Sequence, residues 1–189
     1  MKWVRRILSV LFALPLLAVI GLLLAGQREG AGRNTDRLAI GRPPSLVYRH
    51  LVSADLLRTW TGLAEVEVLG GGEIRAGSRV RLVSEARGQR TTMEAEVTGA
   101  EPGRLLTLAV RTAAGSPVGF SQRAEYRMEE RGGDTRLAVT TDTSYEGVVA
   151  GLLEPLITRA VQKQLEASLE RLRVQVEAGP ALAPGPAPR

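Results

Sequence analysis

Hydrophobic and polar residues alternate one by one through the middle of this chain. A period of two places every second side chain on the same face of a β-strand, so the pattern predicts strands with one apolar and one polar face. It occupies residues 78–84, 90–98, 120–130 and 135–145, and residues 104–111 predict a further strand whose second face is less polar. Shorter runs predict two further strands at residues 37–41 and 64–69. Sequences rich in Gly, Pro and Asp separate these strands and predict turns.

The pattern changes to a helical period near the end of the chain. Apolar residues recur every three or four positions over residues 147–176 and form one stripe, with a kink expected at Pro155. Two short helices are expected earlier, one from Pro43 and Pro44 to residue 52 and one capped by Ser53. A sheet and a helix that are each apolar on one side bury both surfaces when the sheet curls around the helix.

A different kind of segment opens the chain. The run that begins at Ile7 and ends at Gly26 has no charged residue, and as a helix it spans about 30 Å, the thickness of a bilayer's hydrocarbon core. Positive charges precede it, which predicts a cytoplasmic N-terminus and a domain on the other side of the membrane. We expect an uncleaved, single-pass signal anchor. The alternative is a signal peptide whose cleavage releases the domain as a secreted protein.

The composition then divides the chain into four segments. We expect a signal anchor at residues 1–26, a polar linker at 27–36 and a folded domain at 37–178. Residues 179–189 alternate Pro, Ala and Gly, which cannot form a core, so we expect a disordered tail.

Charge and composition exclude several functions. Of the net charge of +5, three charges belong to Lys2, Arg5 and Arg6, so the domain is nearly balanced. Arg and Glu alternate over residues 123–129, which indicates a solvated face, and we expect no nucleic-acid partner. The chain has no cysteine, which excludes disulfides, thiol nucleophiles and thiolate zinc sites.

Candidate chemistry is sparse. His50 is the only histidine, and we expect it to be a partly exposed helix residue. The acidic residues fall in turns or on outward strand positions, which are poor places for a shielded general acid or base. We therefore predict no catalytic residue, no metal site and no cofactor.

The inward strand positions are the best candidates for a ligand site. Large or adaptable side chains there suit an apolar pocket, although the same residues can simply fill a core. Thr141 and Thr143 are of interest because inward hydroxyls need hydrogen-bond partners, although threonine is also a common strand residue. The candidates are Trp60, Met93, Phe120, Tyr126, Met128, Thr141, Thr143 and Tyr145.

The order of elements, with four short motifs, resembles a known superfamily. The motifs are IGRPPSLVY at residues 40–48, LLRTW at 56–60, GDTRL at 133–137 and LEASLERLRVQV at 165–176. They are similar to those of the START/Bet v 1-like superfamily, also called SRPBCC, which includes polyketide cyclases and dehydratases. The resemblance implies an α+β helix-grip fold, in which a curved antiparallel sheet wraps around a long C-terminal helix. The N-terminal anchor departs from the family, because most relatives are soluble.

The same resemblance implies a cavity for a hydrophobic molecule between sheet and helix. The leading hypothesis is therefore a membrane-anchored binding domain for a hydrophobic or lipid-like small molecule, with the bilayer beside it. One alternative is an enzyme of the polyketide cyclase or dehydratase type, in which Tyr126, Tyr145 or His50 would act. The other is an interaction module without a pocket. Fold alone does not choose among them.

Overall fold

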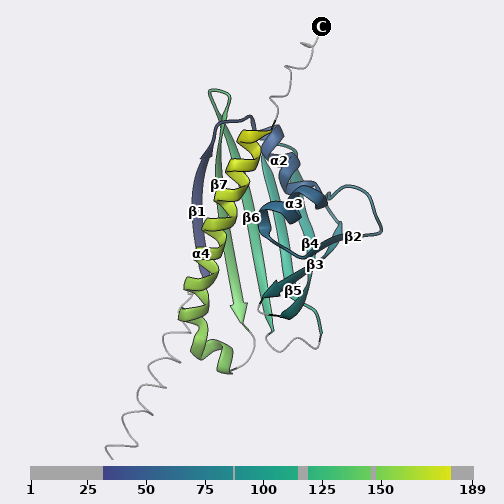
Figure 1. Ribbon diagram of the computed structural model, residues 1–189, viewed down its shortest axis with the longest axis vertical. Helices are drawn as coiled ribbons and strands as arrows, with labels where there is room; N and C mark the ends of the chain where they lie inside the picture. Colours follow the sequence, from purple (N-terminus) through teal and green to yellow (C-terminus); the bar gives the residue numbers. More distant parts are fainter. Residues whose placement is uncertain (1–31, 87, 115–118, 146–147, 180–189) are drawn as a thin grey trace, which may run out of the picture.

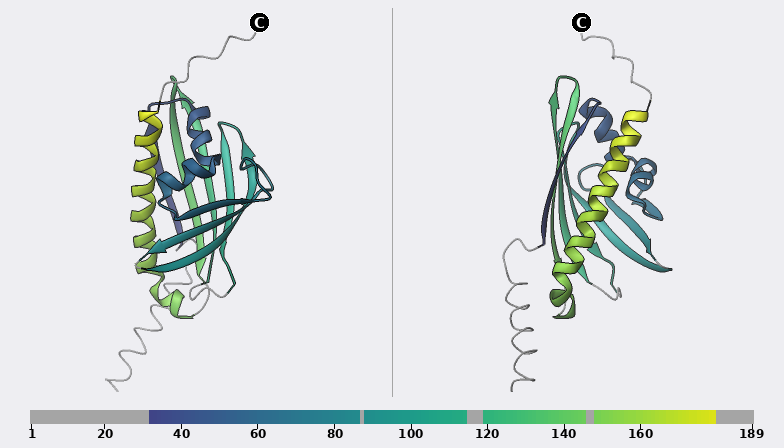
Figure 2. Two further views of the ribbon diagram at one scale, coloured as in Figure 1. Left: turned by 45° about the vertical axis from the view of Figure 1, so that its right-hand side comes forward. Right: turned by 60° about the vertical axis from the view of Figure 1, so that its left-hand side comes forward.

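The computed structural model describes residues 32–86, 88–114, 119–145 and 148–179. A seven-stranded antiparallel sheet runs in the order β1-β7-β6-β5-β4-β3-β2. The described helices lie on one face of it, which we call the inner face, and the opposite face is the outer face (Figures 1 and 2). The elements are β1 (Arg33–Ile40), α2 (Pro44–Val52), α3 (Ala54–Thr61), β2 (Glu65–Leu69), β3 (Arg79–Ala86), β4 (Gln89–Glu101), β5 (Leu105–Thr112), β6 (Phe120–Arg131), β7 (Asp134–Tyr145) and α4 (Val148–Ala178). The α+β helix-grip prediction is confirmed for this part of the chain.

The hairpin of β6 and β7 is the longest pairing in the sheet. It is in register from Phe120 opposite Tyr145 to Arg131 opposite Asp134, which leaves two turn residues. These are Gly132 and Gly133, whose φ angles are 62° and 92°. Two positive φ angles in a two-residue turn match the twist of the flanking strands, and glycine adopts both angles without strain.

β1 begins earlier than the sequence indicates. Residues 33–36, assigned above to the linker, pair with β7 as the first half of the strand. Their composition is polar, so they lack the apolar alternation that predicts a strand. As the outermost strand of the sheet, β1 needs only one row of backbone partners, and β7 supplies that row.

The two short helices follow directly from β1. Pro44 stands at the start of α2, where its missing N–H is not needed. Ser53 is the N-cap residue of α3, as expected, but its side chain makes no capping hydrogen bond. α3 ends at Gly62, which has the left-handed φ of 76° typical of a helix C-terminus. Both helices turn apolar side chains toward α4 and the sheet.

α4 supplies the main helical part of the core. Leu169, Leu172 and Val176 lie three and four positions apart and are 1%, 0% and 0% exposed. They belong to the same buried cluster as Ile40 and Leu137 of the sheet. The ribbon of α4 changes direction near its N-terminal end (Figure 1).

Hydrogen bonds attach the C-terminal end of α4 to the corner between β1 and α2. The backbone N–H of Gly41 donates to Glu177 Oε1 over 2.9 Å. Arg42 Nη2 donates to the Glu177 carbonyl over 2.6 Å, and Thr135 Oγ1 donates to the Arg42 carbonyl over 2.6 Å. Farther along the helix, Arg171 Nε donates to the Trp60 carbonyl of α3 over 2.9 Å. This end of α4 is therefore fixed by directional bonds as well as by packing.

No described helix has both the length and the apolar composition needed to cross a bilayer. The predicted anchor at residues 7–26 and the tail at 180–189 lie outside the described residues. Both stay predictions.

Candidate functional site

The register of the sheet fixes which side chains share its inner face. Phe120 lies opposite Tyr145, Ala124 opposite Thr141, and Tyr126 opposite Val139. Directly opposed residues of neighbouring strands point to the same side. The period-two prediction is therefore confirmed across β6 and β7, and the pairing of β5 with β6 continues the same face.

One part of the inner face is closely packed. It contains Ile40, Leu106, Met128, Leu137 and Val139, each 4% exposed or less. These side chains share one buried cluster with Leu169, Leu172 and Val176 of α4. A close-packed core of this kind has no room for a ligand. We call it the packed region.

The neighbouring part of the inner face is incompletely covered. Its side chains keep part of their surface accessible although they stand on the side that the helices cover. This accessible region comprises Met93, Leu108, Thr112, Phe120, Gln122, Tyr126 and Tyr145. Most of its side chains are large and apolar or aromatic. Such surface on the covered side of a sheet suits contact with an apolar molecule.

Tyr126 lies at the border of the two regions. Burial raises the pKa of its phenol to about 12, because the surrounding protein disfavours the charged form. The side chain still keeps some accessible surface, and its hydroxyl has no hydrogen-bond partner among the described residues. At neutral pH the phenol is therefore protonated, and its O–H can donate a hydrogen bond to a ligand.

The two inward threonines differ in their partners. Thr143 is 9% exposed, and its Oγ1 accepts a hydrogen bond of 3.0 Å from Gln122 Nε2. Thr141 is 4% exposed, and its Oγ1 is buried without a partner in the part of the chain described. A buried hydroxyl without a partner is uncommon and carries a cost in free energy.

Phe120, Tyr145 and Met93 lie toward the ends of their strands. The rings of Phe120 and Tyr145 form a cross-strand pair with centroids 6.4 Å apart and planes tilted by 55°. Met93 lies opposite Thr112, whose Oγ1 accepts a 3.0 Å hydrogen bond from the Phe120 backbone N–H. These three candidates from the sequence therefore stand on one stretch of the inner face.

Trp60 and Met128 stand elsewhere. Trp60 is 1% exposed, and its indole N–H donates to the His50 carbonyl over 3.2 Å. Met128 is 4% exposed within the packed region. The structure thus separates these two residues from the accessible region.

His50 is buried, so the prediction of a partly exposed helix residue is wrong. It is 7% exposed, and its Nδ1 lies 2.9 Å from the Leu46 carbonyl, one helical turn earlier. Position 50 falls on the buried stripe of α2 with Leu46, Val47 and Leu51. Packing between α2 and the core therefore decides its exposure, and the ring nitrogen is held by the helix backbone.

Gln122, Leu108 and Thr112 belong to the accessible region but are absent from the candidates chosen by sequence. The signal for Gln122 and Leu108 was present, since each occupies an inward position of a predicted strand. A polar residue at an inward position is informative because it must find a partner, and Gln122 finds Thr143.

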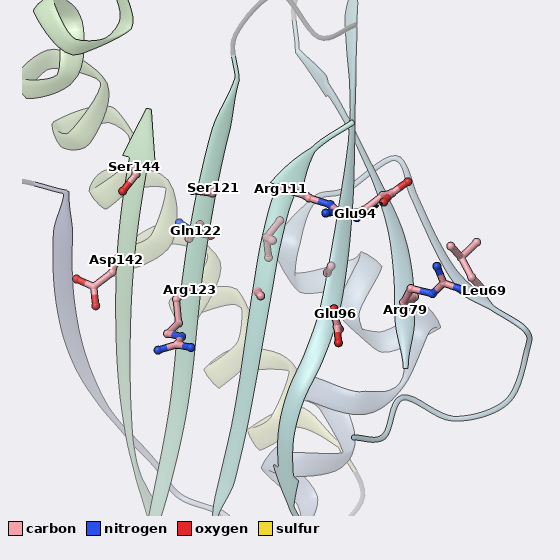
Figure 3. Close-up of a pocket in the computed structure, with 13 residues that line it drawn as sticks. Leu69, Arg79, Glu94, Glu96, Arg111, Ser121, Gln122, Arg123, Asp142 and Ser144 are labelled. Atoms are coloured by element: carbon pink, nitrogen blue, oxygen red, sulfur yellow. Dashed lines mark hydrogen bonds and ion pairs between the residues drawn. The ribbon is translucent and has the colours of Figure 1, made fainter. Parts of the chain in front are cut away.

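The outer face carries a shallow hollow of about 510 Å³ (Figure 3). Charged side chains of both signs surround it, with the helices behind the sheet in this view. Arg111 pairs with Glu94 at 3.3 Å, and Asp142 pairs with Arg33 at 3.2 Å. Its lining also includes the small side chains of Ala109, Ser121 and Ser144, and the alternation of the strands does not predict such a hollow. Such an exposed charged surface does not suit an apolar ligand.

The described residues contain no group of three or more acidic or histidine side chains that could hold a metal ion.

Comparisons with known proteins agree with this architecture. Residues 35–177 match the sequence profile of a family described as "Polyketide cyclase / dehydrase and lipid transport". No curated protein matches the sequence.

Solved structures share the fold at low sequence identity. The crystal structure of Ara h 8.0201 is 10% identical with a TM-score of 0.63, over 78% of this chain and 98% of that one. A conserved protein from Geobacillus kaustophilus is 13% identical with a TM-score of 0.64, over 76% and 94%. A protein from Rhodobacter sphaeroides is 22% identical with a TM-score of 0.59, over 79% and 95%. At these identities the likeness shows the fold alone. The profile match covers most of the chain, so the protein belongs to the polyketide cyclase/dehydrase and lipid transport family.

Proposed function

We propose that the domain binds a hydrophobic or lipid-like small molecule between the inner face of the sheet and α4. The observation that carries the proposal is the accessible region. Met93, Leu108, Phe120 and Tyr126 keep accessible surface on the covered side of the sheet. An apolar ligand in contact with them removes that surface from water, which contributes about 25 cal/mol for each Å² buried.

Family membership supports the same function. The description of the family joins polyketide cyclases and dehydrases with lipid transport, and both groups handle largely apolar molecules. The fold supplies a curved sheet and a long helix whose apolar sides face each other. Sites for small molecules in proteins are typically apolar with a few polar groups.

The chemistry of the accessible region favours binding over catalysis. Its polar groups are hydroxyls and the amide of Gln122, without a carboxylate or imidazole among the residues named for it. Burial keeps the pKa of Tyr126 at about 12, so this phenol is a poor base at neutral pH. His50, the third residue considered for catalysis, lies in α2 outside the accessible region, and its Nδ1 lies 2.9 Å from the Leu46 carbonyl.

The proposal includes retention of residues 7–26 as a membrane anchor. A short linker then holds the domain beside a bilayer, which is a reservoir of lipid-like molecules. The intact mass of the protein extracted from membranes tests this part. A mass equal to that of the full sequence is expected, whereas a chain shortened after the apolar run would establish cleavage instead.

Photo-crosslinking tests the binding site itself. The full chain is reconstituted in phosphatidylcholine vesicles and irradiated with an alkyne-tagged pentadecanol that carries a diazirine. Trypsin then separates inner-face positions into distinct peptides at residues 105–111, 112–123 and 124–127. We expect labels on Leu108, Phe120 and Tyr126 within these peptides, in addition to residues 7–26 in the bilayer.

Two neighbouring positions of β5 give a matched control. Leu108 faces inward and Ala109 outward, so L108W fills the proposed site and A109W does not. We expect L108W to reduce labelling of residues 112–123 and A109W to leave it unchanged, with both variants folded by circular dichroism. Labels confined to residues 7–26, or equal effects of the two variants, would contradict the proposal.

A further inference from the structure

Positive charge is segregated to one face of the sheet. The seven described strands contain ten arginines and no lysine, and all ten are exposed. The pairing registers place every one on the outer face, as with Arg79, Arg81, Arg111, Arg123 and Arg127. The inner face of these strands therefore offers no cation to a bound molecule.

The same inner face offers two hydroxyls without partners among the described residues. Thr141 Oγ1 is buried, and Tyr126 has a free phenolic hydroxyl. Tyr126 lies opposite Val139, two residues before Thr141 in β7, so the two are diagonal neighbours on adjacent strands. Between them Ala124, directly opposite Thr141, presents only a methyl group.

We infer that the ligand is an uncharged, oxygenated apolar molecule whose hydroxyl or carbonyl group hydrogen-bonds to Thr141, with Tyr126 as a second donor. This inference rests on the proposed function and narrows the class of ligand. A carbonyl oxygen accepts from both hydroxyls, and a ligand hydroxyl can also donate to Thr141. Either group satisfies the orphaned oxygen of Thr141.

Two other ligand classes fit less well. An ionised carboxylate, as in a free fatty acid, would be buried against the hydroxyls of the sheet without a cation from the described strands, and an unpaired buried charge is far more costly than a neutral polar group. A pure hydrocarbon would leave Thr141 Oγ1 without a partner, which retains the cost of an unmade hydrogen bond. Alcohols, ketones and esters avoid both costs.

Competition against the photo-crosslinking probe tests which of these ligand classes binds best. Tridecan-2-one, dodecan-1-ol, dodecanoate at pH 8 and tridecane compete for labelling of residues 112–123 in the same vesicles. Labelling of residues 7–26 in the bilayer serves as the reference for dilution of the probe in lipid. Relative to that reference, we expect the ketone and the alcohol to compete about tenfold or more better than dodecanoate.

Substitutions then assign the hydrogen bonds. T141V keeps the shape of the side chain and removes its hydroxyl, and Y126F does the same for the phenol. Each should weaken competition by tridecan-2-one about fivefold, the typical effect of one neutral hydrogen bond, and leave tridecane unchanged. T141S keeps a hydroxyl and should restore competition by the ketone. T141V should fold at least as stably as the wild type, because it removes a buried hydroxyl without a partner.

The outcomes separate this inference from the proposed function. No labelling of residues 105–127 under any condition would overturn the proposed function and the inference together. Labelling that dodecanoate prevents as well as the ketone does would overturn the inference and leave the binding function standing. Equal losses for ketone and tridecane in T141V and Y126F would show that these residues only shape the site, which also overturns the inference.

Discussion

The carboxylate of Glu177, in the last turn of α4, accepts a hydrogen bond of 2.9 Å from the backbone N–H of Gly41, just after β1. Glu177 also pairs with Arg173 at 3.5 Å. The C-terminal end of the domain thus binds the segment that follows its first strand. Packing of α4 and the geometry of this corner depend on each other.

Replacement of Glu177 by alanine should destabilise the domain by about 1 kcal/mol, because the Gly41 N–H loses its acceptor at a half-exposed site. Glu166, whose carboxylate is exposed on α4 beside Gln162, provides the control. Urea unfolding of the full chain, followed by near-ultraviolet circular dichroism, compares E177A with E166A. Equal midpoints for the two variants would show that the contact adds no stability.

Two nearby positions of α4 should respond very differently to truncation. Leu172 is 0% exposed in the core, whereas Val174 is 54% exposed. L172A should cost about 2–5 kcal/mol, since it removes buried methyl groups and leaves a cavity. V174A should change the free energy of unfolding by less than about 0.5 kcal/mol. The same urea experiment measures both, and similar losses would contradict the orientation of the helix.

Tyr126 should make stability fall at high pH. Its pKa is raised from the ordinary 10.0 to about 12 in the folded protein, so the unfolded chain loses this proton first as the pH rises. The contribution is fully present below pH 10 and is lost as the pH passes through about 12, by roughly 2 kcal/mol. The difference in unfolding free energy between wild type and Y126F, measured from pH 8 to 12, isolates it. A constant difference would refute the raised pKa.

The turn between β6 and β7 should tolerate some residues and reject others. Gly133 has a φ of 92°, so G133A forces an alanine into a strained conformation and should cost about 1 kcal/mol or more. G132N should be nearly neutral, because Asn followed by Gly suits a two-residue turn with two positive φ angles. Thermal unfolding compares the two variants. A loss in G132N as large as that in G133A would argue against this turn geometry.

The sequence predicted the meander and the C-terminal helix closely because their signals are local. The strand predicted at residues 120–130 is observed as Phe120–Arg131, and the helix predicted at 147–176 as Val148–Ala178. Alternation and a helical stripe each require only neighbouring residues to reveal them. Glycine-rich turns supplied the boundaries, as at Gly132 and Gly133.

What the sequence did not reveal depends on tertiary contacts. The first half of β1 is polar and becomes a strand only because β7 pairs with it. His50 is buried because α2 packs its whole stripe against the core. The split of the inner face into packed and accessible regions depends on where α4 approaches the sheet, and no single strand's pattern contains that information. Gln122 could have been chosen as a site candidate from the sequence, because it occupies an inward position in the alternation of β6.

The place of β1 at the edge of the sheet imposes an order on folding. β2 to β7 each pair with strands adjacent in sequence, so this meander can form by local closure of short turns as the chain emerges. β1 pairs only with β7, with Arg33 opposite Asp142 and Ile40 opposite Thr135. We therefore expect the pairing of β1 with β7 to form last and to be the slow, entropically costly step of sheet formation.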